Sequence, residues 1–436
     1  MSQAQTEQAN QGNQNQNAFL ESVKNNPTFV PLINQDKNRI VPQAVKFEYN
    51  EMDRPVIPEE SDPIKKNQPI QNHKIYRRVE DMSHADACAW VFTSPYTLEK
   101  YFYLHPGLAA RDVRIRVMFS SLCHSDSSSA RGLWGPMIYP ICVGHEIVGE
   151  VIAIGPLVTK FKVGDKVLYG PTRCSCGTCL YCVEGKTNLC PQTPKPIKDV
   201  YGQFWGGYST HIQQPESHCF KLPNNMEIDT APPVMCAGLT MYKPLSLYAK
   251  KGQKVAIIGI GGLGHIGIQI AVKMGLDVDA FISKCDADPK DRIVPEFGAT
   301  RIIHWNTDDL RILENTYDVI LNTVPFGIPA EKMDSLLNCL KPMGKFIVIG
   351  LPALEDKLTF NHRTIIRKGI EVIGTWNGGS KETEETINFC AKNNIKARCE
   401  FFNFEDFPKA LDKMENGLPL FRVVLRVDDF SKQFRR

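Results

Sequence analysis

The chain has 436 residues, of which 42% are hydrophobic and 23% are charged, a composition typical of a globular protein long enough for two domains. Its 51 basic and 48 acidic residues give a net charge of +3, so nucleic acid or an anionic membrane is not expected as a partner. Small-molecule chemistry is therefore the expected class of function. The most apolar stretch is interrupted by five glycines, His265 and Gln269, and no transmembrane segment is predicted.

The amino terminus lacks the apolar core of a secretory signal. With its first arginine at Arg39 and an acidic Glu7, it is also a poor mitochondrial presequence. These features predict a cytoplasmic location. Fourteen cysteines would indicate disulfides in a short secreted chain, but in a large chain without a signal they indicate reduced thiols or metal ligands.

Residues 1–83 differ in composition from the rest of the chain. The first seventeen residues hold ten Gln or Asn, and the sequence that follows is rich in Pro, Asn and charge with no sustained hydrophobic period. We predict a disordered amino-terminal arm outside the fold. The alternative is an arm that folds upon a protein partner.

Residues 84–237 predict a β-rich domain, because short apolar runs such as VRIRVMF and EIVGEVIAIG alternate with Gly and Pro. The pattern changes in residues 238–378, where six β-branched runs match the strand count of a doubly wound parallel sheet. These runs are residues 254–259, 277–283, 300–305, 317–324, 345–350 and 370–376.

Residues 379–436 are predicted to return to the first domain. ETEETINFCAKNN and FPKALDKMENG have the apolar spacing of helices, and the apolar run LFRVVLRV is typical of a final strand. The overall prediction is an α/β chain of two domains.

Gly259, Gly261 and Gly264 form a GxGxxG pattern between a predicted strand and the helical run HIGIQIAVKMG, the context that a dinucleotide site requires. The first glycine permits a tight turn, the second lets the backbone approach a pyrophosphate, and the third packs helix on strand. The helix amino terminus then receives the phosphate charge. A glycine-rich turn without a ligand is the alternative, but six strand runs in order favour a cofactor, with Gly262 and Leu263 as further contacts.

The most specific pattern is C-x2-C-x2-C-x7-C, formed by Cys176, Cys179, Cys182 and Cys190. Such short spacings let four thiolates converge on a tetrahedral zinc ion at about 2.3 Å. Four buried free thiols are the alternative, but four cysteines in a hydrophilic stretch cannot be core. We predict a structural zinc lobe, and Cys174 beside it stays unassigned.

Cys123, His145 and Glu146 lie at the ends of predicted strands, where a metal site could form. Each is weak alone, since a single His is more often structural and a single Cys more often a small hydrophobe. A catalytic zinc needs three protein ligands and an open position, and two cysteines with one histidine suit alcohols. Cys236, just before the nucleotide-binding half, would be the second thiolate, so that metal and cofactor meet in one cleft.

Seven motifs occur in the order found in the zinc-containing medium-chain alcohol dehydrogenases: CHSD, GHEIVGEV, the four-cysteine lobe, GGYS, CAGLT, GIGGLGHIG and FRVV. The chain most resembles the cinnamyl alcohol dehydrogenase branch, over roughly residues 85–430. The resemblance implies a GroES-like catalytic domain, a Rossmann domain and a homodimer. It also implies a catalytic zinc on Cys123, His145 and Cys236, with Glu146 as an alternate or fourth ligand, and hence two zinc ions per subunit.

The resemblance further implies that Ser125 lies on the proton relay and that Asp126 orients His145. Hydride would pass between the nicotinamide ring and the carbon of a primary alcohol or aldehyde, while zinc acts as a Lewis acid. Leu133, Trp134 and part of TWNGG are expected pocket walls, which favour an aromatic or medium-chain substrate such as cinnamaldehyde. These wall residues serve domain packing in the alternative interpretation.

Two positions depart from the family pattern. The His usually found five residues after the first zinc cysteine is Ser128, so the relay must be shortened or rerouted. The Gly usually found two residues before that cysteine is Ser121, which is expected to crowd the strand. With the foreign arm, these changes support a second hypothesis, a dehydrogenase fold kept as a structural or binding subunit of a larger assembly. The complete ligand set and the intact glycine motif argue against it.

NADP(H) is the predicted coenzyme. In NAD enzymes an Asp or Glu about 20 residues past the glycine motif binds the ribose 2′-hydroxyl, and that position is Ser283 here. Its hydroxyl can donate to a phosphate, while Lys284 and Lys290 supply positive charge. In the alternative interpretation, Ser283 is an ordinary residue at a strand end.

Overall fold

The computed structural model describes residues 77–434, except 106, 136, 138, 193–205, 284–289, 326–327 and 355. The predicted arm therefore lies outside the described residues up to 76. Its last residues do not match the prediction, because β1 (Arg77–Val79) pairs antiparallel with β3 (Thr97–Leu104). The boundary predicted at residue 83 is thus too late by this strand.

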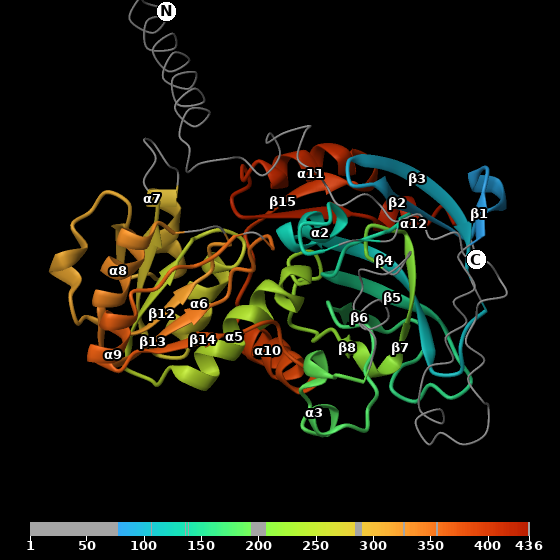
Figure 1. The fold of residues 1–436 in the computed structure, drawn as a ribbon. Coiled ribbons are helices and arrows are strands. Elements are labelled where there is room, and N and C mark those ends of the chain that lie inside the picture. Colours follow the sequence, from blue (N-terminus) through green and yellow to red (C-terminus); the bar gives the residue numbers. More distant parts are fainter. Residues whose placement is uncertain are drawn as a thin grey trace, which may run out of the picture.

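The β-rich half contains two sheets, at the right of Figure 1. The smaller has the order β1-β3-β2, with β2 spanning Ala87–Ser94. The larger has the order β15-β16-β4-β5-β6-β8, with β7 paired to β4. Its strands are β4 (Asp112–Leu122), β5 (Ile147–Ile154), β6 (Lys166–Tyr169), β7 (His211–Pro215), β8 (Cys219–Lys221), β15 (Cys399–Asn403) and β16 (Arg422–Arg426).

The end of the chain joins this half through its last two strands. β16 runs antiparallel to β4 and parallel to β15, so the last strands complete the larger sheet. The two predicted helices are also confirmed, as α10 (Ser380–Asn393) and α11 (Phe407–Glu415). The half also contains short helices: η2 (Met82–His84), α2 (His124–Ala130), α3 (Leu180–Val183), η3 (Thr187–Leu189), η4 (Glu216–His218), η5 (Pro232–Met235), η8 (Phe404–Asp406) and α12 (Asp428–Ser431).

The second half is a six-stranded parallel sheet in the order β11-β10-β9-β12-β13-β14. Each of the six predicted runs contains one strand or part of one: β9 (Lys254–Ile258), β10 (Asp277–Ile282), β11 (Arg301–His304), β12 (Tyr317–Asn322), β13 (Leu340–Val348) and β14 (Glu371–Gly374). The strand order reverses between β9 and β12, and such a switch point is where doubly wound sheets bind ligands, at the carboxyl ends of their strands. The predicted Rossmann architecture is confirmed.

Both faces of the parallel sheet are buried at its inner strand β9. In β9, Val255 and Ile257 pack into one hydrophobic cluster, while Ala256 and Ile258 pack into another on the opposite face. This burial on two sides explains why the strand is continuously apolar. The elements around the sheet are α5 (Ala237–Tyr248), α6 (Gly264–Lys273), α7 (Lys290–Ile293), η6 (Val294–Phe297), η7 (Leu310–Leu313), α8 (Ala330–Asn338) and α9 (His362–Lys368), together with α10.

One hydrophobic cluster crosses between the two halves. Val148 and Leu168 of the antiparallel sheet pack in the same cluster as Met235, Met241 and Ile257. The segment between η5 and α5 carries Cys236. Because both halves pack against this segment, the position of Cys236 is fixed. Among the described residues, no helix has both the length and the apolar character needed to cross a membrane.

Candidate metal and coenzyme site

Four predicted ligands meet in a buried cluster. One ligand atom from each of Cys123, His145, Glu146 and Cys236 lies within 4.8 Å of all the others, and all four residues are buried. Cys123 directly follows β4, and His145 and Glu146 directly precede β5. The two strands pair antiparallel, and the Ser121 amide donates to the Glu146 carbonyl at 2.9 Å, so pairing brings these segments together.

Asp126 holds the histidine of this cluster. Its carboxylate accepts a hydrogen bond from His145 Nδ1 at 2.7 Å, which places a proton on Nδ1 and makes Nε2 the candidate ligand atom. The same carboxylate accepts from the Gly144 amide at 2.9 Å, the Cys123 amide at 3.2 Å and the Tyr208 hydroxyl at 2.7 Å. Asp126 thus ties three chain segments to the site.

Arg422 was not predicted as a site residue. Its guanidinium is buried and bonds the Glu146 carboxylate, and it donates to Ser121 Oγ from Nε at 3.3 Å and from Nη2 at 3.0 Å. Ser121 was expected to crowd the strand, but its hydroxyl instead accepts hydrogen bonds from Arg422. The motif FRVV contained the signal for Arg422, but only the pairing of β16 with β4 shows where it lies.

The donor set of this cluster fits zinc. The contact between the two thiols lowers the pKa of Cys123 well below its usual value and raises the pKa of Cys236. Burial raises the pKa of Glu146 to about 7, although Arg422 opposes this, and Glu146 Oε1 is buried without a hydrogen-bond partner among the described residues. Zinc prefers sulfur, imidazole and carboxylate ligands, so a buried cluster of these three groups favours the binding of Zn²⁺.

The four-cysteine lobe, residues 176–190, has a second cluster. Its four sulfurs all lie within 4.8 Å of one another, with Sγ to Sγ distances of 3.8 Å (Cys176–Cys182), 3.5 Å (Cys179–Cys182) and 3.9 Å (Cys179–Cys190). Ligands at about 2.3 Å from a tetrahedral zinc would be about 3.8 Å apart. The observed spacing thus matches zinc ligation, and all four cysteines are free of disulfides.

Local geometry also prepares this lobe for a cation. Gly177 has a φ of +74°, the left-handed turn that lets the chain fold back on Cys176. Although burial opposes it, hydrogen bonds from the Thr178 and Cys179 amides lower the pKa of Cys176. Amide donors that stabilise a thiolate are suited to a structural metal site.

The glycine turn has the geometry of a phosphate-binding loop. Gly259 has a φ of +89°, and a Cβ on Gly264 would lie 2.3 Å from the Gly259 carbonyl, so neither position accepts a side chain. A Cβ on Gly261 would meet nothing within 4 Å, which leaves open space beside the backbone at that position. Leu263 is the N-cap of α6, so the turn leads directly into the positive end of the helix.

Two of the three residues predicted to select the coenzyme lie among the described residues. Ser283 is exposed and directly follows β10, as predicted, and Lys290 begins α7, whereas Lys284 lies outside the described residues. The nearest strand carboxylate, Asp279, is fully buried and bonds Lys254 at 3.2 Å, Arg301 at 2.6 Å and the Tyr317 hydroxyl at 2.6 Å. Asp279 is therefore unavailable to a ribose.

The remaining predicted residues lie around the metal cluster or at the boundary between the halves. Ser125 and Ser128 are in α2, which begins directly after Cys123. The Leu133 carbonyl accepts from the Leu354 amide at 3.2 Å, so the loop of the β-rich half that carries Leu133 and Trp134 contacts the Rossmann half.

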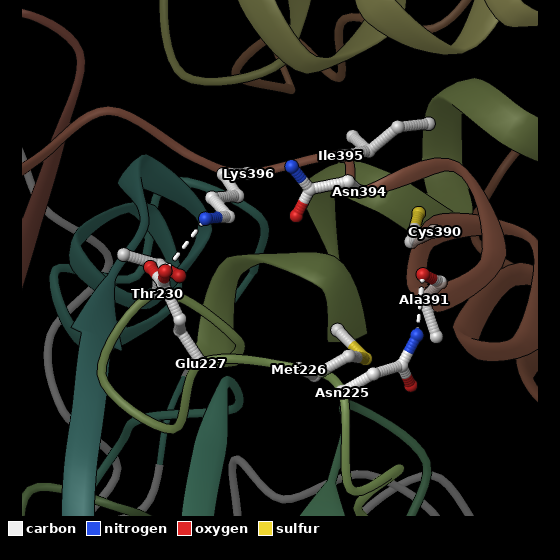
Figure 2. Close-up of a pocket in the computed structure, with 9 residues that line it drawn as sticks. All are labelled: Asn225, Met226, Glu227, Thr230, Cys390, Ala391, Asn394, Ile395 and Lys396. Atoms are coloured by element: carbon white, nitrogen blue, oxygen red, sulfur yellow. Dashed lines mark hydrogen bonds and ion pairs between the residues drawn. The ribbon is translucent and has the colours of Figure 1, made fainter.

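A small pocket separate from these residues lies between the loop at 225–230 and the end of α10 (Figure 2). In it, Lys396 pairs with Glu227 at 2.6 Å, and Asn225 donates to the Ala391 carbonyl at 2.8 Å. Its volume of about 10 Å³ suits one water molecule and no coenzyme. None of its lining residues is a predicted site residue.

Comparison with known proteins decides the family. Residues 109–224 match the alcohol dehydrogenase GroES-like domain, and residues 262–392 match the zinc-binding dehydrogenases. The chain is 34% identical over 341 residues to cinnamyl alcohol dehydrogenase 8 of Arabidopsis thaliana, a match covering 77% of this chain and 93% of the relative. The chain belongs to the zinc-containing medium-chain alcohol dehydrogenases. The resemblance inferred from the motifs is thereby confirmed.

Solved structures of this alcohol dehydrogenase family share the fold. A structure of CAD from Helicobacter pylori complexed with NADP(H) is 29% identical, with a TM-score of 0.70 over 78% of this chain and 98% of that one. Acetophenone reductase from Geotrichum candidum in complex with NAD is 28% identical, with a TM-score of 0.68 over 79% and 98% of the two chains. Similar folds thus bind either coenzyme.

Proposed function

We propose that this alcohol dehydrogenase transfers hydride between NADP(H) and a primary alcohol or aldehyde, with an aromatic or medium-chain substrate. Its catalytic zinc would be held by Cys123, His145 and Cys236, with Glu146 as an alternate or fourth ligand. A second, structural zinc would be held by the four-cysteine lobe. The activity of the cinnamyl alcohol dehydrogenase relatives and the donor sets described above support this proposal.

One observation carries the proposal, namely that Arg422 lies between the metal cluster and the coenzyme turn. Its guanidinium bonds Glu146, and its Nη1 lies 2.7 Å from where a Cβ on Gly262 would be. A single buried side chain therefore contacts both the predicted zinc ligands and the predicted pyrophosphate turn. Hydride transfer requires such closeness, because substrate and nicotinamide must react within one water-excluding cleft.

The chain's own residues bind and orient in this mechanism. The ion would supply Lewis acidity toward the substrate oxygen. Asp126 keeps the imidazole of His145 in one tautomer and one orientation. Ser125 is the proposed first group of the proton relay, and with Ser128 in place of histidine the relay would continue without an imidazole at that position. The glycine turn and the amino terminus of α6 would hold the coenzyme phosphates.

We expect the zinc-replete protein to oxidise NADPH when supplied with cinnamaldehyde or benzaldehyde, and to do so faster than with acetaldehyde. An apolar pocket gains roughly 0.8 kcal/mol per buried methylene-sized group, so the larger aldehydes should have the higher kcat/KM. Loss of absorbance from NADPH measures this directly. If the zinc-replete protein consumes no aldehyde with either coenzyme, the structural-subunit hypothesis replaces this one.

Wild-type protein is expected to prefer NADPH over NADH by about ten- to hundredfold in kcat/KM, the range for a hydrogen bond to a charged group. Ser283 can donate to the 2′-phosphate, and no acid lies at that position. Ser283→Asp should reverse the preference, because a carboxylate repels the phosphate and accepts from a ribose hydroxyl. Ser283→Asn, of similar size and no charge, is the control. Equal or higher kcat/KM with NADH in the wild type would refute the preference.

A homodimer and a cytoplasmic location complete the proposal. β14 is an edge strand of the parallel sheet, and its Val372 is 40% exposed, which is the kind of edge a second copy could cover. Light scattering should give about twice the mass of 49.1 kDa, and a monomeric mass would contradict the dimer.

A further inference from the structure

The segment of residues 375–381 links the lobe to the active-site side of the Rossmann half. It begins where β14 ends, and the Thr375 amide donates to the Val348 carbonyl at 3.1 Å. The carboxyl ends of parallel strands are where such sheets bind ligands. On its other side, Asn377 accepts from Thr240 Oγ1 at 3.3 Å, and Thr240 lies in the first turn of α5, which follows Cys236.

The four-cysteine lobe holds this segment through two hydrogen bonds. Asn188 Nδ2 donates to the Trp376 carbonyl at 3.1 Å, and Thr187 Oγ1 accepts from the Ser380 amide at 3.0 Å. Both lobe residues are almost fully buried. In Figure 1, α10 lies next to the lobe that carries α3, in agreement with the contact between Gly185 and Lys381.

Close backbone packing adds to these hydrogen bonds. A Cβ on Gly379 would lie 1.9 Å from the Gly185 carbonyl, so only glycine allows the lobe to approach this closely. The Lys381 amide also points to that carbonyl at 3.5 Å. Asn377, in between, has a φ of +39° and is buried, so the segment takes a left-handed turn that its neighbours must hold.

We propose that the four-cysteine lobe fixes residues 375–381 against the substrate cleft, and that Thr187 and Asn188 are positioning residues for substrate binding. Both lie in η3, directly before the ligand Cys190, whose amide donates to the Thr187 carbonyl at 3.2 Å. The side chains of Thr187 and Asn188 thereby connect the folded lobe to the segment beside the cleft. This inference rests on the proposed function for its substrate, and on hydrogen bonds and close backbone packing for the positioning.

The test compares Thr187→Val and Asn188→Ala with the wild type in full-length protein. We expect amide hydrogen exchange in residues 376–381 to become about three- to tenfold faster, the effect of losing one hydrogen bond, while exchange in β9 stays unchanged. KM for cinnamaldehyde should rise by a similar factor, with zinc content and the Kd of NADPH unchanged. Thr187→Ser should restore both values, because it keeps the accepting oxygen.

Leu189→Ala is the matched control, since this exposed residue lies in the same η3 helix and makes no hydrogen bond through its side chain. Unchanged amide hydrogen exchange in both Thr187→Val and Asn188→Ala would overturn the positioning role. Faster exchange with an unchanged KM would overturn the link to substrate binding. If the wild type reduces no aldehyde, the proposed function fails, and the exchange experiment still decides whether the lobe holds the segment.

Discussion

Replacement of Cys123 with serine is expected to lower kcat/KM for aldehyde reduction by roughly a thousandfold or more. Cys123 contributes one of two cysteine sulfurs to a buried cluster, and a serine hydroxyl stays protonated and binds zinc poorly. Loss of the Lewis acid removes several kcal/mol of transition-state stabilisation, and each 1.36 kcal/mol is a factor of ten. Metal analysis should show one zinc per chain instead of two, with NADPH binding retained.

Cys219→Ser is the matched control for this experiment. Cys219 is also fully buried in the β-rich half, but it belongs to neither metal cluster, and its thiol donates to the Pro215 carbonyl at 3.5 Å, a bond that a hydroxyl can keep. It should retain activity and both zinc ions. A Cys123→Ser protein with two zinc ions and near wild-type turnover would exclude this cluster as the catalytic centre.

Cys179→Ala is expected to lower the free energy of unfolding by about 3–5 kcal/mol. Few single substitutions have so large an effect, and loss of a structural metal is one of the mechanisms that produce it. Cys179 is within 3.9 Å of two other lobe sulfurs, so its removal leaves three ligands for a tetrahedral ion. Bound zinc should fall from two toward one per chain. The folded fraction should still bind NADPH, because none of the lobe cysteines is a predicted coenzyme contact.

Thermal unfolding and metal analysis of the folded fraction measure both effects. Cys174→Ala is a suitable comparison, because Cys174 is buried two residues before the lobe without being one of its four clustered cysteines. That variant should keep two zinc ions. A Cys179→Ala protein that also keeps two would contradict the assignment of the lobe.

Short-range patterns explain why much of the molecule could be predicted. The lobe ligands lie within fifteen residues and need only a local turn at Gly177, so their spacing is sufficient. The inner strands β9, β10 and β12 are almost entirely buried, which makes them largely apolar runs that are easy to recognise. The glycine turn can also be recognised from its sequence. Gly259 needs a left-handed φ, and a Cβ on Gly264 would collide with backbone, so both positions require glycine.

Long-range pairing explains what could not be predicted from spacing. Cys123 and His145 meet only because β4 and β5 pair, so no local pattern joins them, and they were grouped with Cys236 from the ligand set that a catalytic zinc requires and from the family resemblance. Arg422 was missed for the same reason, since its place beside Ser121 depends on β16 lying against β4. β1 is a three-residue edge strand, too short to show any alternation.

The most direct test of a zinc-dependent hydride transfer is the rate of NADPH oxidation with cinnamaldehyde while zinc is returned to chelator-treated protein. If the account is correct, the rate is near zero in chelated protein that still binds NADPH. The rate then rises as zinc is returned and is fully restored once two ions per chain are bound, whereas the rate of the Cys123→Ser variant stays near zero. Full activity without zinc, or no activity with two zinc ions bound per chain, would contradict the account.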